Sequence, residues 1–296
     1  MTTRNTALAF AMCIGPGEAE MAIDNLDAIR QLYPDAVAWV RDDMTDDGTW
    51  EKVSGWIAKT GSNTLLSRNP SRFGYHGIMR TFGHLLLEVA PSRPDMLIKI
   101  DPDTVLIRGG LDRIFQDRFA QNGPGMSGSY QISPTGARRK FRNHAAMVLL
   151  DLLPVGPKKK LCRMRWGPTS YATFILKALT HGYRPGEHVQ GGLYAIHGFT
   201  LQKLLNSGFL EAIAFGRSGM VWTEDVMLGM GTKAVGDRLS SLNENLLHAP
   251  SHIQAFRPLN ISDDRLRDPC LLAVHPVKRE DHLLRSTLRD LRMLTV

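Results

Sequence analysis

The chain has 296 residues, 43% hydrophobic and 22% charged, with a formal net charge of +7. This is the composition of a globular protein with a sizeable core, and the chain has no low-complexity tract or repeat. Its N-terminal apolar run, residues 7–14, is far shorter than the roughly 20 residues of a membrane-spanning helix and lacks the flanks of a signal peptide. We therefore expect a cytosolic protein whose positive charge favours anionic partners.

Apolar runs and amphipathic segments alternate in the first hundred residues. Strands are predicted at residues 8–14, 36–40 and 96–100, and helices at 18–32, 49–59 and 74–89. This alternation favours a parallel sheet, in which ligands bind at the carboxyl ends of the strands. Asp42 and Asp43 follow the second strand. Asp101 and Asp103 follow the third, so all four acids are expected at one edge of the sheet.

The second half of the chain is less regular. Helices are predicted at residues 110–120, 168–180 and 197–208, from 224 onward, and at 279–294, where the segment is basic and amphipathic. Shorter strands are predicted at residues 191–196, 234–236, 248–256 and 270–277.

The triplet Asp101-Pro102-Asp103 interrupts an apolar segment. Two carboxylates this close repel each other unless a positive group lies between them. A divalent cation that also binds a diphosphate would suit them, because Mg²⁺ and Mn²⁺ prefer carboxylate and phosphate oxygens. A plain turn is the alternative, since Asp and Pro are common in turns.

Three further motifs have a functional and an ordinary interpretation. Gly191-Gly192 precedes a strand and allows a ligand to approach the backbone, or forms a simple turn. Glu224-Asp225 opens a helix, where acids are also favoured by the helix dipole. His275 ends an apolar strand, where it is a candidate metal ligand or an ordinary edge residue.

Taken in order, "DPD", "QGG", "TED" and "AVHP" resemble the motif set of the GT-A glycosyltransferases. The segment "VRDDMTDDGTW" is similar to the acidic segment of that family that contacts the nucleotide base. The wording "EDVMLG" and "HPVK" is closest to the fringe-like and β1,3-galactosyltransferase-like branch. The resemblance covers residues 8–278 and implies one α/β domain of the GT-A type over 1–296, with a Rossmann-like, mostly parallel central sheet and flanking helices. Residues 1–110 would form the nucleotide-sugar-binding half, and 111–296 the acceptor-binding half with a C-terminal helix, the fold including a smaller acceptor-side subregion.

The resemblance implies metal-dependent, inverting transfer of a sugar from a nucleotide-sugar, by analogy UDP-linked, to a hydroxyl of a glycan, a lipid or a small molecule. Asp101, Asp103 and His275 would hold Mn²⁺ or Mg²⁺, which as a Lewis acid neutralises the diphosphate leaving group. Asp225 would be the general base, and Glu224 would orient sugar hydroxyls. The candidate donor-binding residues are Asp42 and Asp43 toward the base ring, Asp101 toward the ribose or metal, Gly191 and Gly192 toward a sugar, and Arg80, Lys99 and Lys278 toward the diphosphate. For these last three, a solvated or structural charge is the alternative.

Nine Lys and Arg residues and one acid lie in residues 138–165. A basic amphipathic segment of this kind can lie on an anionic membrane, so peripheral contact with the inner membrane surface is one hypothesis. A lid over the donor and a solvated basic face over buried leucines are the others.

Three other functions fit the sequence less well. A dinucleotide-dependent oxidoreductase would use "GPGEAE", but Glu20 stands where a small residue is needed and would repel a pyrophosphate. A sugar-phosphate nucleotidyltransferase would carry a glycine-rich loop with Arg or Lys near the N-terminus, and "IGPGEAEMA" has no such residue. A non-enzymatic nucleic-acid binder is suggested only by the charge, because the basic segment has little aromatic interleaving.

Overall fold

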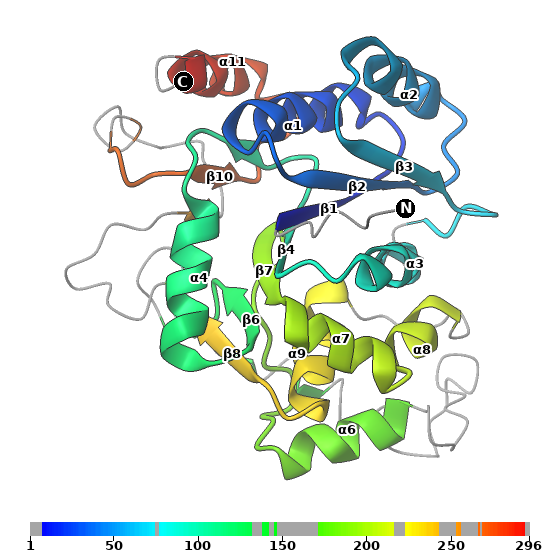
Figure 1. Cartoon of the computed structure of the whole chain (residues 1–296), viewed down its shortest axis with the longest axis vertical. Coiled ribbons are helices and arrows are strands. Elements are labelled where there is room, and N and C mark those ends of the chain that lie inside the picture. Colours follow the sequence, from blue (N-terminus) through cyan, green and yellow to red (C-terminus); the bar gives the residue numbers. More distant parts are fainter. Residues whose placement is uncertain are drawn as a thin grey trace.

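The computed structural model describes residues 8–74, 77–131, 138–141, 145–146, 171–215, 223–242, 253–255, 266 and 268–293. Within these residues the centre of the molecule is a seven-stranded sheet in the order β3-β2-β1-β4-β7-β6-β8 (Figure 1). Its strands are β1 (Leu8–Ile14), β2 (Val37–Asp42), β3 (Thr64–Arg68), β4 (Met96–Ile100), β6 (Gly125–Gly128), β7 (Leu193–His197) and β8 (Arg238–Ser241). Neighbouring strands are parallel except at β7, which is antiparallel to β4 and β6. The predicted α/β fold with a mostly parallel central sheet is confirmed.

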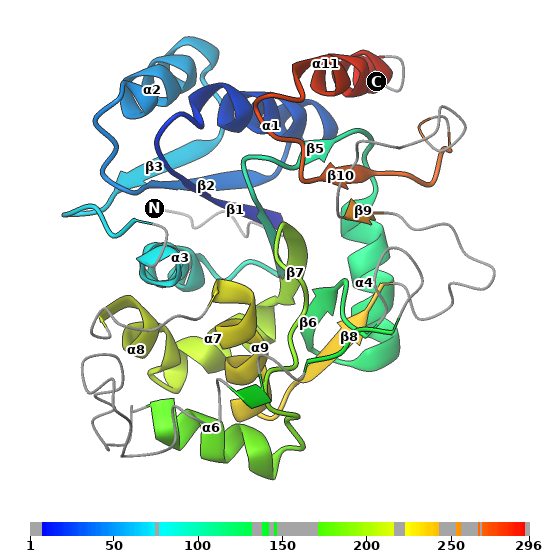
Figure 2. The same cartoon turned by 180° about the vertical axis from the view of Figure 1, so that it is seen from behind.

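Helices cover both faces of this sheet (Figures 1 and 2). The helices of the described residues are α1 (Ala19–Leu32), α2 (Thr49–Thr60), α3 (Ile78–Val89), α4 (Leu111–Asn122), α6 (Tyr171–Thr180), α7 (Gly198–Asn206), α8 (Phe209–Phe215), α9 (Glu224–Ala234) and α11 (His282–Met293). Helices α1 and α2 lie on one side of β1 and β2, and α3 lies on the other side with α7 and α8 beyond it. The sheet therefore separates two apolar layers.

Alternating side chains of β1 divide between those layers. Phe10 and Met12 are buried in the cluster that includes Leu26 of α1, whereas Ala9 and Ala11 are buried in the cluster that includes Phe82 of α3. Successive side chains of a strand point to opposite faces, so a strand covered on both sides is apolar throughout. This explains why β1 is an unbroken apolar run in the sequence.

A second, three-stranded sheet lies beside the carboxyl end of β4. Its strands, in the order β5-β10-β9, are β5 (Val105–Leu106), β10 (Ala273–His275) and β9 (Ile253–Ala255). Strand β10 runs antiparallel to β5 and parallel to β9. Leu288 of α11 packs with Val105 and Val274 in a separate apolar cluster. The last described part of the chain is thereby placed against the turn that follows β4.

The sequence prediction is wrong at several minor elements. Strand β3, whose side chains are mostly only partly buried, was not among the predicted strands. Strand β6 reads Gly-Met-Ser-Gly and is fully buried through packing with its neighbours, not through its own apolar pattern. The strand expected at 234–236 is instead the end of α9 and a turn before β8. The helix expected from residue 74 begins at Ile78.

Among the helices that can be described, none combines the length and the apolar character needed to cross a bilayer.

Candidate active site

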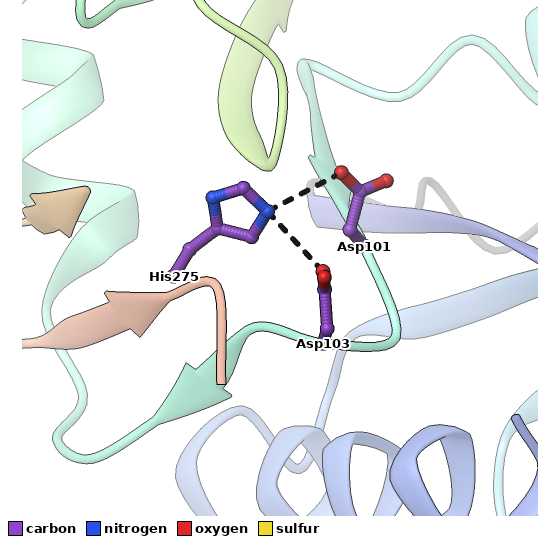
Figure 3. Close-up of side chains that lie close together, drawn as sticks. All are labelled: Asp101, Asp103 and His275. Atoms are coloured by element: carbon purple, nitrogen blue, oxygen red, sulfur yellow. Dashed lines mark ion pairs between the residues drawn. The ribbon is translucent and has the colours of Figure 1, made fainter. Parts of the chain in front are cut away.

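Asp101, Asp103 and His275 converge at the junction of the two sheets (Figure 3). The two acids follow β4, and His275 is the last residue of β10. His275 Nε2 lies 3.2 Å from Asp103 Oδ1 and 3.7 Å from Asp101 Oδ2. One nitrogen and two carboxylate oxygens lie within 4.8 Å of one another. The predicted convergence of these residues is therefore present.

This donor set fits a divalent cation. Carboxylate oxygens suit Mn²⁺ and Mg²⁺, and an imidazole nitrogen is a common additional ligand of transition metals. The His275 ring reaches the acids because Gly192 has no side chain. A β-carbon on Gly192 would lie 2.4 Å from the ring, and Gly192 has φ +93°, a conformation that L side chains rarely adopt.

The Gly191-Gly192 pair also connects the acids of the site. The backbone N–H of Asp101 donates to the carbonyl of Gly192 at 2.8 Å, and the Thr104 hydroxyl donates to the same oxygen at 3.1 Å. The N–H of Gly191 donates to Asp225 Oδ2 at 2.9 Å. These two glycines, for which the sequence allowed either a ligand-approach loop or a simple turn, lie between the two groups of acids.

Two side chains, those of His275 and Lys278, contact the carboxylate of Asp103. Besides His275, the Lys278 ammonium donates to its second carboxylate oxygen. Burial raises the pKa of Asp103, but the hydrogen bonds and charge of His275 and Lys278 outweigh that effect, so the pKa lies well below its ordinary value. Lys278, predicted to contact a diphosphate, therefore lies beside the candidate cation ligands.

Lys99 links the metal-ligand cluster to the Glu224-Asp225 motif. Its ammonium is buried, 2.5 Å from Asp101 Oδ1 and 2.8 Å from Glu224 Oε1, and lies over the ring of Tyr194. Burial lowers the pKa of Lys99, but the two carboxylates raise it by a larger amount. The pKa therefore lies above its ordinary value, and the side chain stays charged. Lys99, two residues before Asp101 in the sequence, therefore forms ion pairs with acids of the site.

Asp225 lies in the first turn of α9 and is held by several donors. Its carboxylate accepts from the backbone N–H of Gly191, from the N–H of Val226 at 2.8 Å and from the hydroxyl of Thr223. Burial raises the pKa of Asp225, but His188 and these hydrogen bonds lower it more, so the carboxylate is ionised at neutral pH. Burial raises the pKa of Glu224, and Lys99 only partly offsets it. The two adjacent acids therefore have different environments.

Arg139 and His188 were not predicted from the sequence as site residues. Arg139 Nη2 lies 2.7 Å from His188 Nε2, and that nitrogen lies 3.8 Å from Asp225 Oδ2. Arg139 Nη1 also donates to the carbonyls of Ser129, Tyr130 and His188. Arg139 belongs to the basic segment 138–165, most of which falls outside the described residues. Its guanidinium therefore lies beside His188 and the Glu224-Asp225 motif.

Glu18 was also missed, in the loop after β1. Its carboxylate accepts from the N–H of Gly15 at 2.6 Å. Burial, and then the negative charges of Asp101 and Asp103, raise the pKa of Glu18 to about 7. The motif "GPGEAE" contains this acid, but the sequence pattern gave no indication that the loop faces the triplet.

Asp42 and Asp43 are at the predicted edge of the sheet, but their carboxylates are buried and hydrogen-bonded within the protein. Asp42 accepts from Thr45 and pairs with Arg68 at 2.8 Å. Asp43 accepts from Asn69 and Thr81 and from two backbone N–H groups. Contact of either acid with a nucleotide base stays a prediction.

A surface depression of about 580 Å³ lies next to this edge, lined in part by Thr45, Glu51, Arg68 and Arg72. Arg80 lies on α3, away from this depression. Its guanidinium carbon is 4.1 Å from the centre of the Phe73 ring, and its Nε is near the carbonyl of Ala214. The described contacts of Arg80 therefore do not join it to the acidic cluster.

Solved structures that match the chain include glycosyltransferases. The mannosyltransferase PcManGT from Pyrobaculum calidifontis, in complex with GDP-Man and Mn²⁺, is 12% identical over 98% of this chain and 62% of that chain, with a TM-score of 0.44. The galactosyltransferase LgtC, in complex with donor and acceptor sugar analogs, is 11% identical over 97% of this chain and 96% of that chain, with a TM-score of 0.47. Residues 1–349 of S. aureus TarS are 13% identical over 80% of this chain and 58% of that chain, with a TM-score of 0.43.

The chain thus spans less than two thirds of the matched PcManGT and TarS chains. No family model matches the chain, and no curated protein matches it. At these identities and TM-scores, the similar structures assign neither a family nor an activity.

Proposed function

We propose that the chain is a metal-dependent, inverting glycosyltransferase of the GT-A type, nearest to the fringe-like and β1,3-galactosyltransferase-like branch. It would move a sugar from a nucleotide-sugar, by preference UDP-linked, to a hydroxyl of a glycan, a lipid or a small molecule. The observation that carries the proposal is the meeting of Asp101, Asp103 and His275 beside a second group of acids, Glu224 and Asp225. A metal-dependent, inverting transfer of the proposed kind uses a cation site for the diphosphate and a carboxylate as base for the acceptor alcohol.

Asp101, Asp103 and His275 would hold Mn²⁺ or Mg²⁺. The cation would supply a Lewis acid for the negative charge that develops on the diphosphate as the donor bond breaks. Lys278 contacts Asp103 directly, so its ammonium is in position to bind a diphosphate oxygen as well. Asp42, Asp43 and the depression beside Arg68 remain the candidates for the nucleotide base, and Arg80 for the diphosphate.

In the proposed reaction, the bond between the anomeric carbon and the diphosphate oxygen breaks, and its electron pair leaves with the nucleoside diphosphate. The acceptor oxygen forms the new bond on the opposite side of that carbon, and its proton passes to Asp225. The low pKa of Asp225 keeps it ionised to receive that proton. Glu224, fixed by Lys99, would orient sugar hydroxyls, and the backbone at Gly191 and Gly192 would border the sugar.

The basic segment 138–165 would meet a lipid-linked acceptor at an anionic membrane, and that role stays a hypothesis. Arg139, near the start of this segment, forms hydrogen bonds with His188 and nearby carbonyls.

The test is a donor panel. The protein is incubated with UDP- and GDP-sugars and Mn²⁺, and release of the nucleoside diphosphate is measured, because such enzymes slowly transfer their sugar to water. Release that requires Mn²⁺ and is lost in Asp103→Ala supports the proposal. Release of pyrophosphate from a nucleoside triphosphate and a sugar phosphate would indicate a nucleotidyltransferase instead. Absence of nucleotide-sugar binding and turnover across the panel would contradict the proposal.

A further inference from the structure

Arg285 of α11 contacts both chain segments that carry the candidate cation ligands. Its Nη2 donates to the carbonyl of Pro102, at 3.4 Å, and to the carbonyl of Val277, at 3.0 Å. Pro102 lies between the two acids of the triplet, and Val277 lies two residues after His275. One buried guanidinium therefore connects the triplet turn to the end of β10.

Arg285 is itself fixed by a buried acid. Its Nη1 lies 2.8 Å from Asp24 Oδ2 of α1. Asn25, the next residue of α1, donates to the carbonyls of Asp101 and Pro102 at 3.2 and 3.0 Å. The turn between the two acids is therefore held from α1 and from α11, which are far apart in the sequence and adjacent in space (Figure 1).

Two other arginines of α11 also pair with Asp24. Arg289 Nε lies 2.9 Å from Asp24 and its side chain is about half exposed. Arg292 is buried, lies 3.3 Å from Asp24 and donates to the carbonyl of Leu106 at 2.8 Å. Asp24 consequently keeps two cationic partners when Arg285 is replaced, so the replacement does not leave an isolated buried charge.

We propose that Arg285 is a positioning residue for the candidate cation site: it holds the Asp101–Asp103 turn and the His275–Val277 segment at the separation that binds the ion. The inference rests on the proposed function, because that function supplies the cation. A charged donor to two carbonyls fixes both segments more firmly than neutral hydrogen bonds, since hydrogen bonds with an ionised partner are roughly twice as strong. A backbone hydrogen bond from the N–H of Val277 to the carbonyl of Asp103, at 2.7 Å, also joins these two segments. This bond forms only when the two segments are correctly aligned.

The test measures Mn²⁺ binding to the full chain by the loss of the free Mn²⁺ electron paramagnetic resonance signal. Arg285→Met removes the donors and keeps most of the side-chain volume. Arg292→Met is the matched control, because it removes a buried arginine from the same acid and helix. Arg289→Met is the exposed control. Chemical unfolding of each protein without metal gives the stability change separately.

We expect Arg285→Met to weaken Mn²⁺ binding about 10-fold or more, as the loss of outer-shell partners of metal sites typically does. Arg292→Met should lower stability and leave Mn²⁺ affinity near that of the unchanged protein. Arg285→Lys keeps a positive charge beside Asp24, so this variant should fold. It loses the planar guanidinium that reaches both carbonyls, so it should bind Mn²⁺ more weakly than the unchanged protein does. This variant carries the test if Arg285→Met does not fold.

Equal losses of Mn²⁺ affinity in the Arg285 and Arg292 variants, or unchanged affinity in both Arg285 variants, would overturn the positioning role while leaving the cation site in place. Failure of the unchanged protein to bind Mn²⁺ would instead overturn the cation site of the proposed function, and the inference with it.

Discussion

Gly192 lies directly against the imidazole of His275, so closely that an added β-carbon would approach the ring to 2.4 Å. The backbone at Gly192 and the side chain of His275 are therefore in direct contact at the candidate cation site. Gly192 also accepts the N–H of Asp101, so it contacts two of the three candidate ligands. The absence of a side chain at this position is a requirement of the site as well as of the turn.

The first prediction concerns that contact. Gly192→Ala should displace the His275 ring and weaken Mn²⁺ binding by about 10-fold or more. It should also destabilise the protein by about 1–3 kcal/mol, because φ is +93° at this residue. Gly61→Ala is the control: it has φ +58° and open space around it, so only the backbone strain should appear. Mn²⁺ affinity that is the same in both variants would count against the contact.

The second prediction separates binding from chemistry at Asp225. Asp225→Asn should leave donor binding nearly unchanged and lower transfer by about 10²–10⁴-fold, the usual contribution of a general base. Donor affinity is measured by calorimetry and transfer by product formation, with Asp117→Asn on the exposed part of α4 as the control. Transfer near the native rate in Asp225→Asn would show that another group accepts the proton.

The third prediction concerns the buried ion pairs of Lys99. Lys99→Met should destabilise the protein by about 3–5 kcal/mol at neutral pH, because it leaves Glu224 buried without its cation. Lys52→Met, at an exposed position of α2, should change the free energy of unfolding by less than about 0.5 kcal/mol. Denaturant unfolding compares the two. A small effect of Lys99→Met would mean that Glu224 takes up a proton at little cost.

The fourth prediction is a pH dependence at Glu18, measured with a chelator present. Burial raises the pKa of Glu18 from its ordinary value of 4.5 to about 7, so the folded protein binds a proton at this carboxylate more tightly than the unfolded chain does. The resulting stabilisation is full below pH 4.5 and is lost as the pH rises through 7. Glu18→Gln should therefore match the native protein in acid and exceed it at pH 8 by up to about 3 kcal/mol. Equal stability at pH 8 would show that the folded state does not raise this pKa.

The sequence predicted the parts of the fold that repeat a simple physical pattern. Strand β1 and helix α1 follow from an unbroken apolar run and an amphipathic segment, and the placement of Asp101 and Asp103 follows from the end of β4. His275 could be proposed as a ligand only through a motif resemblance. Its distance to Asp103 depends on the pairing of β10 with β5, which no local pattern encodes.

The remaining features arise from contacts between distant segments. Arg285 and Asp24 are 261 positions apart, and Arg139 and His188 are 49 positions apart. In the sequence, Arg285 belongs to a basic helix and Arg139 to a basic segment. From this context alone, both side chains would be interpreted as ordinary solvated charges. Burial decides their roles, and burial is known only once the sheets and helices are assembled.

As far as the central sheet is described, β7 is the one strand that runs antiparallel to both of its neighbours. The candidate site lies across the boundary between β4 and β7, which we call the seam. On one side of the seam β4 leads into Asp101, and on the other β7 starts just after Gly191 and Gly192, with Ile100 opposite Leu193. The backbone ladder along this seam sets how far apart the two groups of acids stand. One residue inserted into either strand would slip the ladder and turn its side chains to the other face, so the strand lengths here constrain the chemistry as strictly as the acids do.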